Sequence, residues 1–280
     1  MSSSSSLFER VRDFCKAAGL KLNKDLGQHF LIDQSVLDAI LDAANIQPSD
    51  HIVEIGAGIG VLTNELLMKT AKVTTVEVDD RMIPMLKFYL VSNGQSNERV
   101  TGLEIIRANA LSVPFPDEPY KIVANIPYHI TSPLLRHAFL EGKKAPTSLT
   151  LLIQREVAEK ICDPEDAGLL TIVVALFGTP HVVKIVPPNS FLPPPKVDSA
   201  VLHIDCFDTP LAPPAVIDTV LTIVKHGFSQ KRKMLRNTIS TLDGGADAMK
   251  SAGIDPTRRP QTLSVQEWIR LAESMIATQH

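Results

Sequence analysis

The tetrapeptide Asn125-Ile126-Pro127-Tyr128 follows a short apolar run and brings together an amide, a constrained backbone and an aromatic ring. The side-chain oxygen of Asn125 is a hydrogen-bond acceptor, and the restricted backbone before Pro127 can direct the Ile126 carbonyl toward the same point. Two such acceptors can bind both N–H groups of an exocyclic amine, while the Tyr128 ring offers a face on which a flat base stacks. The pattern therefore predicts a pocket for an amine-bearing base.

Binding both N–H groups would also prepare the amine for reaction, because its lone pair is drawn out of conjugation and toward an electrophile. The segment 187–195 holds five of the chain's 20 prolines, so we expect a stiff loop without regular structure that presents Phe191 to the second face of the base. A base held in this way must be unpaired or flipped out of a helix. We therefore predict Asn125, Tyr128 and Phe191 as catalytic residues that act by positioning and electrostatics, without a metal.

A glycine-rich segment, "VEIGAGIGVLTNELL" at residues 53–67, follows the first predicted strand and opens a helix. Ligands bind at such places in open α/β sheets, and Gly56 and Gly58 allow the backbone to approach one closely. The GxGxG spacing is one residue short of the dinucleotide pattern GxGxxG, and Glu54 precedes it. A carboxylate would repel a pyrophosphate but would tolerate or favour the cationic sulfonium of S-adenosylmethionine. The segment predicts an S-adenosylmethionine site.

Two further polar residues end the next strands of the predicted sheet. Glu77 closes the second strand, where an acid can accept hydrogen bonds from a ribose diol. Asn109 follows the third strand and is placed to meet the adenine edge, although an asparagine in a turn is an equally good reading. Together with the glycines, these residues predict an adenosine-binding edge.

The elements that must position these residues alternate between short β-branched runs and amphipathic stretches over the first two hundred residues, which predicts an α/β fold with a mostly parallel sheet covered by helices. The predicted strands are 51–55, 72–78, 103–108, 120–125, 148–153, 181–186 and 199–205. Several are almost entirely apolar, as strands covered on both faces are. The last two lack a crossover helix and are expected to form an antiparallel hairpin.

Strand signals stop after residue 208, and the remainder predicts four helices, at 215–227, 230–242, 244–252 and 264–277. The sequence therefore predicts a large domain over residues 1–207 and a small all-helical domain over residues 208–280. The segment from Lys225 to Asn237 carries five Lys or Arg and no acid. Such a patch is typical of phosphate contact, although a solvated helix face would look the same.

The bulk composition is that of an ordinary globular protein, with 44% hydrophobic and 21% charged residues and a net charge of −3. The chain has no apolar run of membrane-spanning length, and its N-terminus lacks the apolar region of a signal peptide. Its three cysteines form no CxxC pair, which predicts buried thiols in a reducing cytosol and no zinc site.

The sequence as a whole resembles the small-subunit ribosomal RNA adenine N6,N6-dimethyltransferase family. The resemblance covers roughly residues 20 to 270 and is carried by eight segments in order: "LGQHFLID" (26–33), "VEIGAGIGVLT" (53–63), "VEVD" (76–79), "NIPYHITSPLL" (125–135), "QREVAEKI" (154–161), "FLPPPKVDSAV" (191–201), "FSQKRKMLRN" (228–237) and "GIDPTRRPQTLS" (253–264). It implies a Rossmann-like class I methyltransferase sheet with a small helical C-terminal domain. It also implies transfer of two methyl groups from S-adenosylmethionine to each of two adjacent adenosines, in a hairpin loop near the 3′ end of small-subunit ribosomal RNA, during ribosome biogenesis.

Carried over residue by residue, the resemblance implies that His29 and Leu31 cover the cofactor and that Asn125 binds the N6 amine of the target adenosine. With the residues argued above, the cofactor set is His29, Leu31, Glu54, Gly56, Gly58, Glu77, Asn109 and Asn125, and the RNA-binding set is Lys231, Arg232, Lys233 and Arg236. The family usually has aspartate where Asn109 stands. Because the amide oxygen can still accept a hydrogen bond from the cofactor's amino group, we expect cofactor binding to survive.

The resemblance further implies an assembling small ribosomal subunit as partner, no membrane, a monomer, and a cytoplasmic location, or a nucleolar or organellar one if the source is eukaryotic. A large-subunit ribosomal RNA adenine methylase of the antibiotic-resistance type shares the glycine loop and the Asn125–Tyr128 motif. An assembly factor or mitochondrial transcription factor that retains the fold is a second alternative. A nicotinamide dehydrogenase is disfavoured by the glycine spacing.

Overall fold

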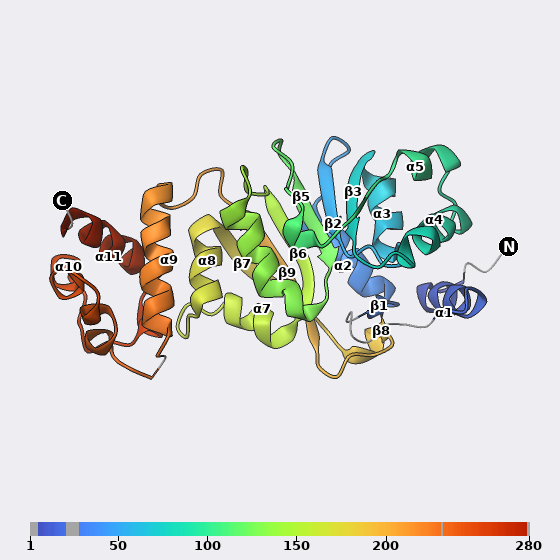
Figure 1. Ribbon diagram of the computed structural model, residues 1–280. Coiled ribbons are helices and arrows are strands. Elements are labelled where there is room, and N and C mark those ends of the chain that lie inside the picture. Colours follow the sequence, from blue (N-terminus) through green and yellow to red (C-terminus); the bar gives the residue numbers. More distant parts are fainter. Residues whose placement is uncertain (1–4, 21–27, 231, 279–280) are drawn as a thin grey trace. The chain divides into compact units, whose positions relative to one another are not determined.

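The computed structural model describes residues 5–20, 28–230 and 232–278 of the chain (Figure 1). The chain divides into two compact units. The first unit consists of the described residues up to Ala158 together with His181–Cys206, and the second consists of Glu159–Pro180 and the described residues from Phe207 onward. The second unit thus includes residues 159–180, which the predicted single boundary at residue 208 placed in the large first domain.

The first unit is built on a seven-stranded sheet with the order β4-β3-β2-β5-β6-β9-β7. The strands are β2 (His51–Ile55), β3 (Lys72–Glu77), β4 (Glu104–Arg107), β5 (Lys121–Asn125), β6 (Ser148–Gln154), β7 (Gly178–Val186) and β9 (Ser199–Cys206). Neighbouring strands from β4 to β6 are parallel, whereas β9 runs antiparallel to β6 and lies beside β7. All seven predicted strands are present, and the last two are neighbours at one edge, as expected.

The central strands are buried on both faces, which explains their apolar sequences. Every residue of β2 and all but the last residue of β6 are buried. Helices on the two faces supply the cover. The helices of this unit are α1 (Leu7–Ala17), α2 (Gln34–Ala44), α3 (Val61–Lys69), α4 (Met82–Ser92), α5 (Asn97–Gly102) and α6 (Thr131–Arg136). The chain first leaves this unit within α7 (Arg155–Ile161), between Ala158 and Glu159.

The strand order reverses at β2, because the chain passes from β2 to β3 on one side and returns to β5 on the other. In open α/β sheets this reversal leaves a crevice beyond the carboxyl ends of the two strands, where ligands bind. The glycines follow β2 and the Asn125–Tyr128 motif begins at the last residue of β5, so the topology brings the two predicted motifs to the same crevice.

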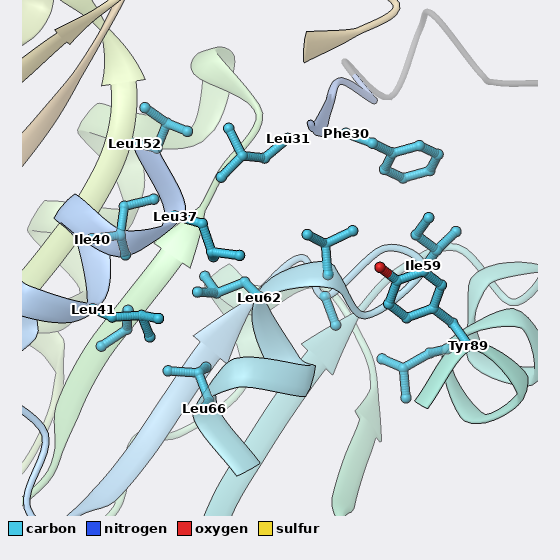
Figure 2. Packing of buried hydrophobic residues seen from close by; sticks show 14 of the residues in the cluster. Phe30, Leu31, Leu37, Ile40, Leu41, Ile59, Leu62, Leu66, Tyr89 and Leu152 are labelled. Atoms are coloured by element: carbon cyan, nitrogen blue, oxygen red, sulfur yellow. The ribbon is translucent and has the colours of Figure 1, made fainter. Parts of the chain in front are cut away.

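A core of buried apolar side chains holds this crevice in place. Figure 2 shows side chains from β1, α2, α3 and β6 directed into one packed interior. Leu37 and Ile40 of α2 and Leu66 of α3 are fully buried there. Helix α2 begins sharply because the Asp33 side chain accepts a hydrogen bond from the Ser35 amide at 3.0 Å. These contacts fix the helix beneath the short strand that precedes it.

That short strand, β1 (Phe30–Leu31), pairs antiparallel with β8 (Phe191–Leu192). Outside the ladder, the Ile32 amide donates to the Ser190 carbonyl at 2.9 Å, and the Ser190 hydroxyl donates to the Asp33 carboxylate at 2.9 Å. We call these paired segments, residues 28–33 and 188–193, the β1–β8 ribbon. The expectation of a proline-rich loop without regular structure is wrong here, because backbone pairing with β1 orders it.

The second unit is helical, with α8 (Leu169–Phe177), α9 (Pro214–Phe228), α10 (Gly245–Ser251) and α11 (Val265–Thr278). Helix α9 contacts both α8 and α11, and α11 contacts α10. The approach of α9 to α11 is close, since a Cβ atom at Gly227 would lie 3.0 Å from the Trp268 ring. Trp268 is fully buried.

The predicted helix at 230–242 is wrong in its described part. Only short 3-10 turns form there, at Leu235–Asn237 and Ile239–Thr241. The Leu235 amide donates to the Arg258 carbonyl at 2.8 Å, and the Arg236 amide donates to the Pro256 carbonyl at 2.9 Å. A helix would need those donors for its own ladder, so the tertiary pairing with residues 256–258 prevails.

None of the helices in the described part of the chain combines the length and the hydrophobicity that a bilayer crossing requires.

Candidate active site

A cavity of about 380 Å³ lies at the carboxyl ends of β2, β3 and β5, within the range of about 300–1,000 Å³ that is typical of small-molecule sites. It is entirely within the first unit. Nine of the predicted site residues line it: His29, Leu31, Glu54, Gly56, Gly58, Glu77, Asn109, Asn125 and Tyr128. The topology therefore brings together almost all of the residues that the sequence singled out, apart from those in the second unit and Phe191.

The glycine loop after β2 forms one wall of the cavity. Gly58 adopts a φ of +55°, and a Cβ atom there would lie 3.0 Å from the Phe30 ring. A side chain at this position would therefore be both strained and crowded. The Gly58 amide donates to Glu77 Oε2 at 2.9 Å, so the loop is fastened to the acid at the end of β3.

Glu77 is buried and is placed by main-chain donors. Its second carboxylate oxygen, Oε1, accepts a hydrogen bond from the Asp79 amide at 2.8 Å. A carboxylate has about four lone-pair sites, so two remain for a ribose diol. Beside it, Val78 is 58% exposed and lines the cavity, where it offers an apolar surface to a flat ring.

Asn109 makes the turn contact that the sequence allowed, and its role at the adenine edge stays a prediction. Its side-chain oxygen accepts a hydrogen bond from the Leu111 amide at 3.0 Å, which caps the short 3-10 turn Ala110–Ser112. The residue is also exposed and lines the cavity. Its amide group and the second lone pair of its oxygen remain for a ligand.

Glu54 lies at the base of the glycine loop and is 1% exposed. Burial raises the pKa of its carboxyl to about 8, opposed by a hydrogen bond from the Thr63 hydroxyl at 2.6 Å and reinforced by the nearby Glu77. At neutral pH the group is therefore mostly protonated. The sequence suggested a fixed negative charge at this position, and burial corrects that picture: a neighbouring cation would favour ionisation of Glu54.

Asn125 ends β5 with its amide orientation set by a hydrogen bond. Its Nδ2 group donates to the His29 carbonyl at 3.1 Å. Because this hydrogen bond fixes which end of the amide is the nitrogen, the side-chain oxygen remains available as a hydrogen-bond acceptor. This is the acceptor that binding of an exocyclic amine requires.

Tyr128 begins a short 3-10 turn, Tyr128–Ile130, immediately after this strand end. Its hydroxyl forms a 2.6 Å hydrogen bond with the buried hydroxyl of Ser199 on β9, and burial raises the pKa of the phenol. The ring is thus held at its far edge while the residue lines the cavity. A rigid aromatic face at this position is suited to stacking on a base.

Phe191 is placed differently from the expectation. It is 2% exposed, belongs to the hydrophobic core, and pairs through its backbone with Leu31 in the β1–β8 ribbon. The described residues that line the cavity do not include it. The structure therefore does not bring Phe191 together with Asn125 and Tyr128, and its stacking role stays a prediction.

The predicted RNA-binding residues belong to the second unit. Lys231 lies outside the described residues, while Arg232, Lys233 and Arg236 are exposed. They occupy turns and not a helix face. The backbone pairing of Leu235 and Arg236 with residues 256–258 brings this basic segment beside Arg258.

Sequence reasoning missed three contributors to the first unit's site. Ser199 fixes the Tyr128 ring, the Pro193 carbonyl binds the His29 ring, and Val78 lines the cavity beside Glu77. Val78 had a readable signal, since it is an apolar residue directly after the strand-ending acid. The other two depend on contacts between segments far apart in the chain.

Comparisons with known proteins bear on this geometry. A family model described as ribosomal RNA adenine dimethylase matches residues 19–277. A ribosomal RNA small subunit methyltransferase A of Dehalococcoides mccartyi is 39% identical over 279 residues, which covers 97% of this chain and 94% of the relative. A protein of the same name from Clostridium botulinum is 37% identical over 265 residues, covering 90% of this chain and 94% of the relative.

Two solved structures resemble the fold over most of the chain. A dimethyladenosine transferase from Plasmodium falciparum is similar with a TM-score of 0.77 and 27% identity, covering 90% of this chain and 98% of the other. The 23S rRNA methyltransferase ErmE is similar with a TM-score of 0.66 and 26% identity, covering 88% of this chain and 99% of the other.

Proposed function

We propose a target for this chain, which belongs to the ribosomal RNA adenine dimethylase family and is an S-adenosylmethionine-dependent ribosomal RNA adenine dimethyltransferase. The proposed target is a pair of adjacent adenosines in the hairpin loop near the 3′ end of small-subunit ribosomal RNA, modified during ribosome biogenesis. The observation that carries the proposal is the tethered amide of Asn125. Its nitrogen donates to the His29 carbonyl, which leaves its oxygen as an acceptor, and Tyr128 and Glu77 line the same cavity.

The residues that line the cavity fit S-adenosylmethionine as the methyl donor. Glu77 has lone pairs for the ribose hydroxyls, and the exposed side chain of Val78 beside it can cover one face of the adenine ring. The backbone at Gly58 leaves no room for a side chain and approaches the cavity directly. Asn109 has an amide for the adenine edge, and His29 and Leu31 line the cavity from the β1–β8 ribbon. When bound, the cofactor supplies an electrophilic methyl group.

The chain's own contribution to transfer is positioning. In this proposal, the Asn125 side-chain oxygen and the Ile126 carbonyl accept the two N–H groups of the adenine, so the nitrogen lone pair is directed at the methyl carbon. Tyr128 stacks on the base and keeps the amine in line. The proton that leaves the methylated nitrogen passes to water or to a nearby acceptor, so no dedicated base is needed to begin the reaction.

A second transfer to the same nitrogen has a physical condition. After the first methylation only one N–H group remains, so one of the two acceptors loses its partner. The pocket must admit the amine after rotation about its bond to the ring. The assignment of two methyl groups therefore rests on the family and not on the geometry of the acceptors.

The proposal places RNA binding in the exposed basic residues of the second unit, Arg232, Lys233 and Arg236, together with Lys231. Interactions with phosphates position the RNA, and base choice is left to the pocket and to RNA shape.

Neutralising Arg232, Lys233 and Arg236 together should weaken RNA binding and reduce the slope of log affinity against log salt. On single-stranded RNA the reduction should be about 0.7 for each phosphate that is no longer neutralised. Cofactor affinity should stay at the parental value, and an unchanged salt slope would refute the assignment.

A large-subunit target is the second candidate, because ErmE, a 23S rRNA methyltransferase, resembles the chain over 88% of its length. The experiment is methyl transfer from labelled S-adenosylmethionine to undermethylated small subunits, with large subunits assayed in parallel and the modified nucleoside identified. N6,N6-dimethyladenosine in the small-subunit RNA alone is the expected product. Label confined to the large subunit would overturn the proposed target. The proposal further assigns the enzyme to the cytoplasm as a monomer.

A further inference from the structure

Arg258 lies in the segment "GIDPTRRPQTLS" (253–264) of the second unit, and its charged group is bound within that unit. Its Nη1 and Nη2 groups donate to the two carboxylate oxygens of Glu267 at 2.5 and 3.2 Å. Its Nε group donates to the Thr262 hydroxyl at 3.2 Å, and Nη2 also donates to the Thr262 carbonyl. These four hydrogen bonds occupy a guanidinium with five N–H donors, which leaves one N–H for any other acceptor.

Glu267 holds this guanidinium from the first turn of α11. The Ser264 amide donates to Glu267 Oε2 at 2.8 Å, and the Glu267 amide donates to the Ser264 hydroxyl at 3.2 Å, which together form a capping box. The hydrogen bond from Arg258 lowers the pKa of the Glu267 carboxyl to about 2, although its partial burial acts in the opposite direction. The carboxylate is therefore charged at neutral pH and fixed at a helix terminus, so it holds the Arg258 side chain at a defined place.

The main chain of Arg258 binds the segment that carries the exposed basic residues, residues 232–236, which we call the basic turn. The Leu235 amide donates to the Arg258 carbonyl at 2.8 Å, and the Arg236 amide donates to the Pro256 carbonyl at 2.9 Å. A turn lacks the repeating hydrogen bonds of a helix, so its place depends on these two bonds and on the fully buried side chain of Leu235. Arg258 thus connects the basic turn, through its main chain, to the start of α11, through its side chain.

We infer that Arg258 is a positioning residue for RNA binding, because its ion pair with Glu267 fixes the backbone to which the basic turn is bound. Arg258 then contributes geometry and not a phosphate contact, although it is a basic residue beside a basic segment. This inference rests on the proposed RNA-binding role of the exposed residues of the basic turn, Arg232, Lys233 and Arg236. Those three residues would contact phosphates, and the ion pair would keep them in one arrangement.

The sign of the effect at Glu267 separates positioning from direct phosphate contact. Glu267→Gln removes a negative charge and keeps an acceptor for the Ser264 amide. If only charge matters, RNA affinity rises, because an acid that opposes phosphate binding is lost and Arg258 is released. If Arg258 acts by position, RNA affinity falls, because the guanidinium loses its charged partner. Arg258→Lys makes the complementary change, since it keeps the positive charge but cannot form the two parallel hydrogen bonds.

The matched control is Glu273→Gln, at an exposed acid of the same helix that makes none of the contacts above. Four quantities are measured for the two single variants, their double variant and the control. They are the affinity for an RNA hairpin that carries the proposed target loop, at several salt concentrations, KM and kcat for undermethylated small subunits, S-adenosylmethionine affinity by calorimetry, and the unfolding temperature. Binding and activity are measured well below the lowest unfolding temperature of the set, so that unfolding does not enter.

If Arg258 positions the basic turn, Glu267→Gln and Arg258→Lys each weaken RNA binding by about 3- to 10-fold, the size expected for the loss of one hydrogen bond. KM for small subunits rises by a similar factor. The value of kcat and S-adenosylmethionine affinity stay near those of the parent, because the cavity belongs to the first unit. The double variant loses little more than either single variant, since both break the same contact. Glu273→Gln binds RNA at least as tightly as the parent.

Unchanged or tighter RNA binding by Glu267→Gln would overturn the inference, because the ion pair would then not support the basic turn. Additive losses in the double variant would overturn it as well, since Arg258 and Glu267 would then act by separate routes. A variant neutralised at Arg232, Lys233 and Arg236 that keeps the parental salt slope would be a different result, because it removes the proposed RNA-binding role of the basic turn itself.

Discussion

The two ends of the cavity are held together in different ways. The end around Glu77, which is proposed to bind the cofactor and is called the cofactor end below, is fastened by hydrogen bonds from the Gly58 and Asp79 amides to Glu77. The end around Asn125 and Tyr128, which is proposed to bind the base and is called the base end below, is fastened by contacts between distant segments: His29 with Pro193, His29 with Asn125, and Tyr128 with Ser199. The difference indicates that the cofactor end is a property of the sheet, while the base end depends on how the β1–β8 ribbon lies over it.

Replacing Glu77 should give the largest effect on the cofactor end. Loss of two charge-assisted hydrogen bonds to a ribose costs enough to lower S-adenosylmethionine affinity by about 100-fold in Glu77→Ala. Glu77→Gln, which keeps acceptor capacity for the Gly58 amide, should lose less. RNA affinity should not change in either variant.

Calorimetry with S-adenosylmethionine and a gel-based RNA binding assay measure the two effects separately. Glu98→Ala, at an acid near the start of α5, serves as the control. Parental cofactor affinity in Glu77→Ala would show that the ribose lies elsewhere, and equal losses of cofactor and RNA affinity would break the distinction between the two ends.

Glu54 should make cofactor binding depend on pH. Because burial raises the pKa of its carboxyl to about 8, deprotonation between pH 7 and pH 9 places a negative charge beside the cavity. If the sulfonium lies next to Glu54, S-adenosylmethionine affinity should rise with pH over this window by at most about tenfold, while affinity for the product S-adenosylhomocysteine, which lacks the sulfonium charge, should not. Glu54→Gln should abolish the difference between the two ligands' pH profiles.

The same group gives a stability signature with the opposite sign. The folded-state pKa of Glu54, about 8, is above the ordinary value of 4.5 that applies when the chain is unfolded. Its stabilising contribution is therefore complete below pH 4.5 and is lost as pH rises through 8. The unfolding temperature of Glu54→Gln should fall less over this range than that of the parent. Parallel pH curves for the two proteins would contradict the assignment.

Removing the support of Tyr128 should give the smallest effect, and one confined to the base end. Ser199→Ala loses one hydrogen bond, worth about 1 kcal/mol, so kcat/KM for RNA should fall about fivefold with cofactor affinity unchanged. Tyr128→Phe removes the same bond from the other side. The double variant should therefore lose little more than either single variant. Additive losses, or a fall in cofactor affinity, would show that Ser199 acts by another route.

The grouping of Gly56, Gly58, Glu77 and Asn109 around one cavity could be predicted from the sequence because these residues lie at or just after the ends of strands. The position of the glycines after β2, and of the acid that ends β3, is set within those short segments and does not depend on contacts with distant parts of the chain. For Asn125 and Tyr128 the same reasoning applies at the end of β5. The seven main strands were predicted for a related reason, since burial on both faces leaves an apolar run that is readable locally.

The remainder could not be predicted because it depends on pairing between segments far apart. Strands β1 and β8 have two residues each, which is too short for any periodic signal, yet their pairing places His29 at the cavity and Phe191 in the core. Likewise, the helical pattern of residues 230–242 is overridden by hydrogen bonds from Leu235 and Arg236 to residues 256–258. Local propensity is a weak guide where tertiary partners compete for the backbone.

Substitution of Asn125 tests the central claim, that the amine of a target adenine is bound by the oxygen of this tethered amide. In Asn125→Ala, S-adenosylmethionine affinity measured by calorimetry should change far less than turnover, because we propose that the cofactor's ribose and adenine bind near Glu77 and Asn109 and not at Asn125. Single-turnover methyl transfer to undermethylated small subunits should fall by about 10²- to 10³-fold, the usual cost of removing one positioned hydrogen-bonding group from a reacting centre. Transfer at the parental rate would contradict the account.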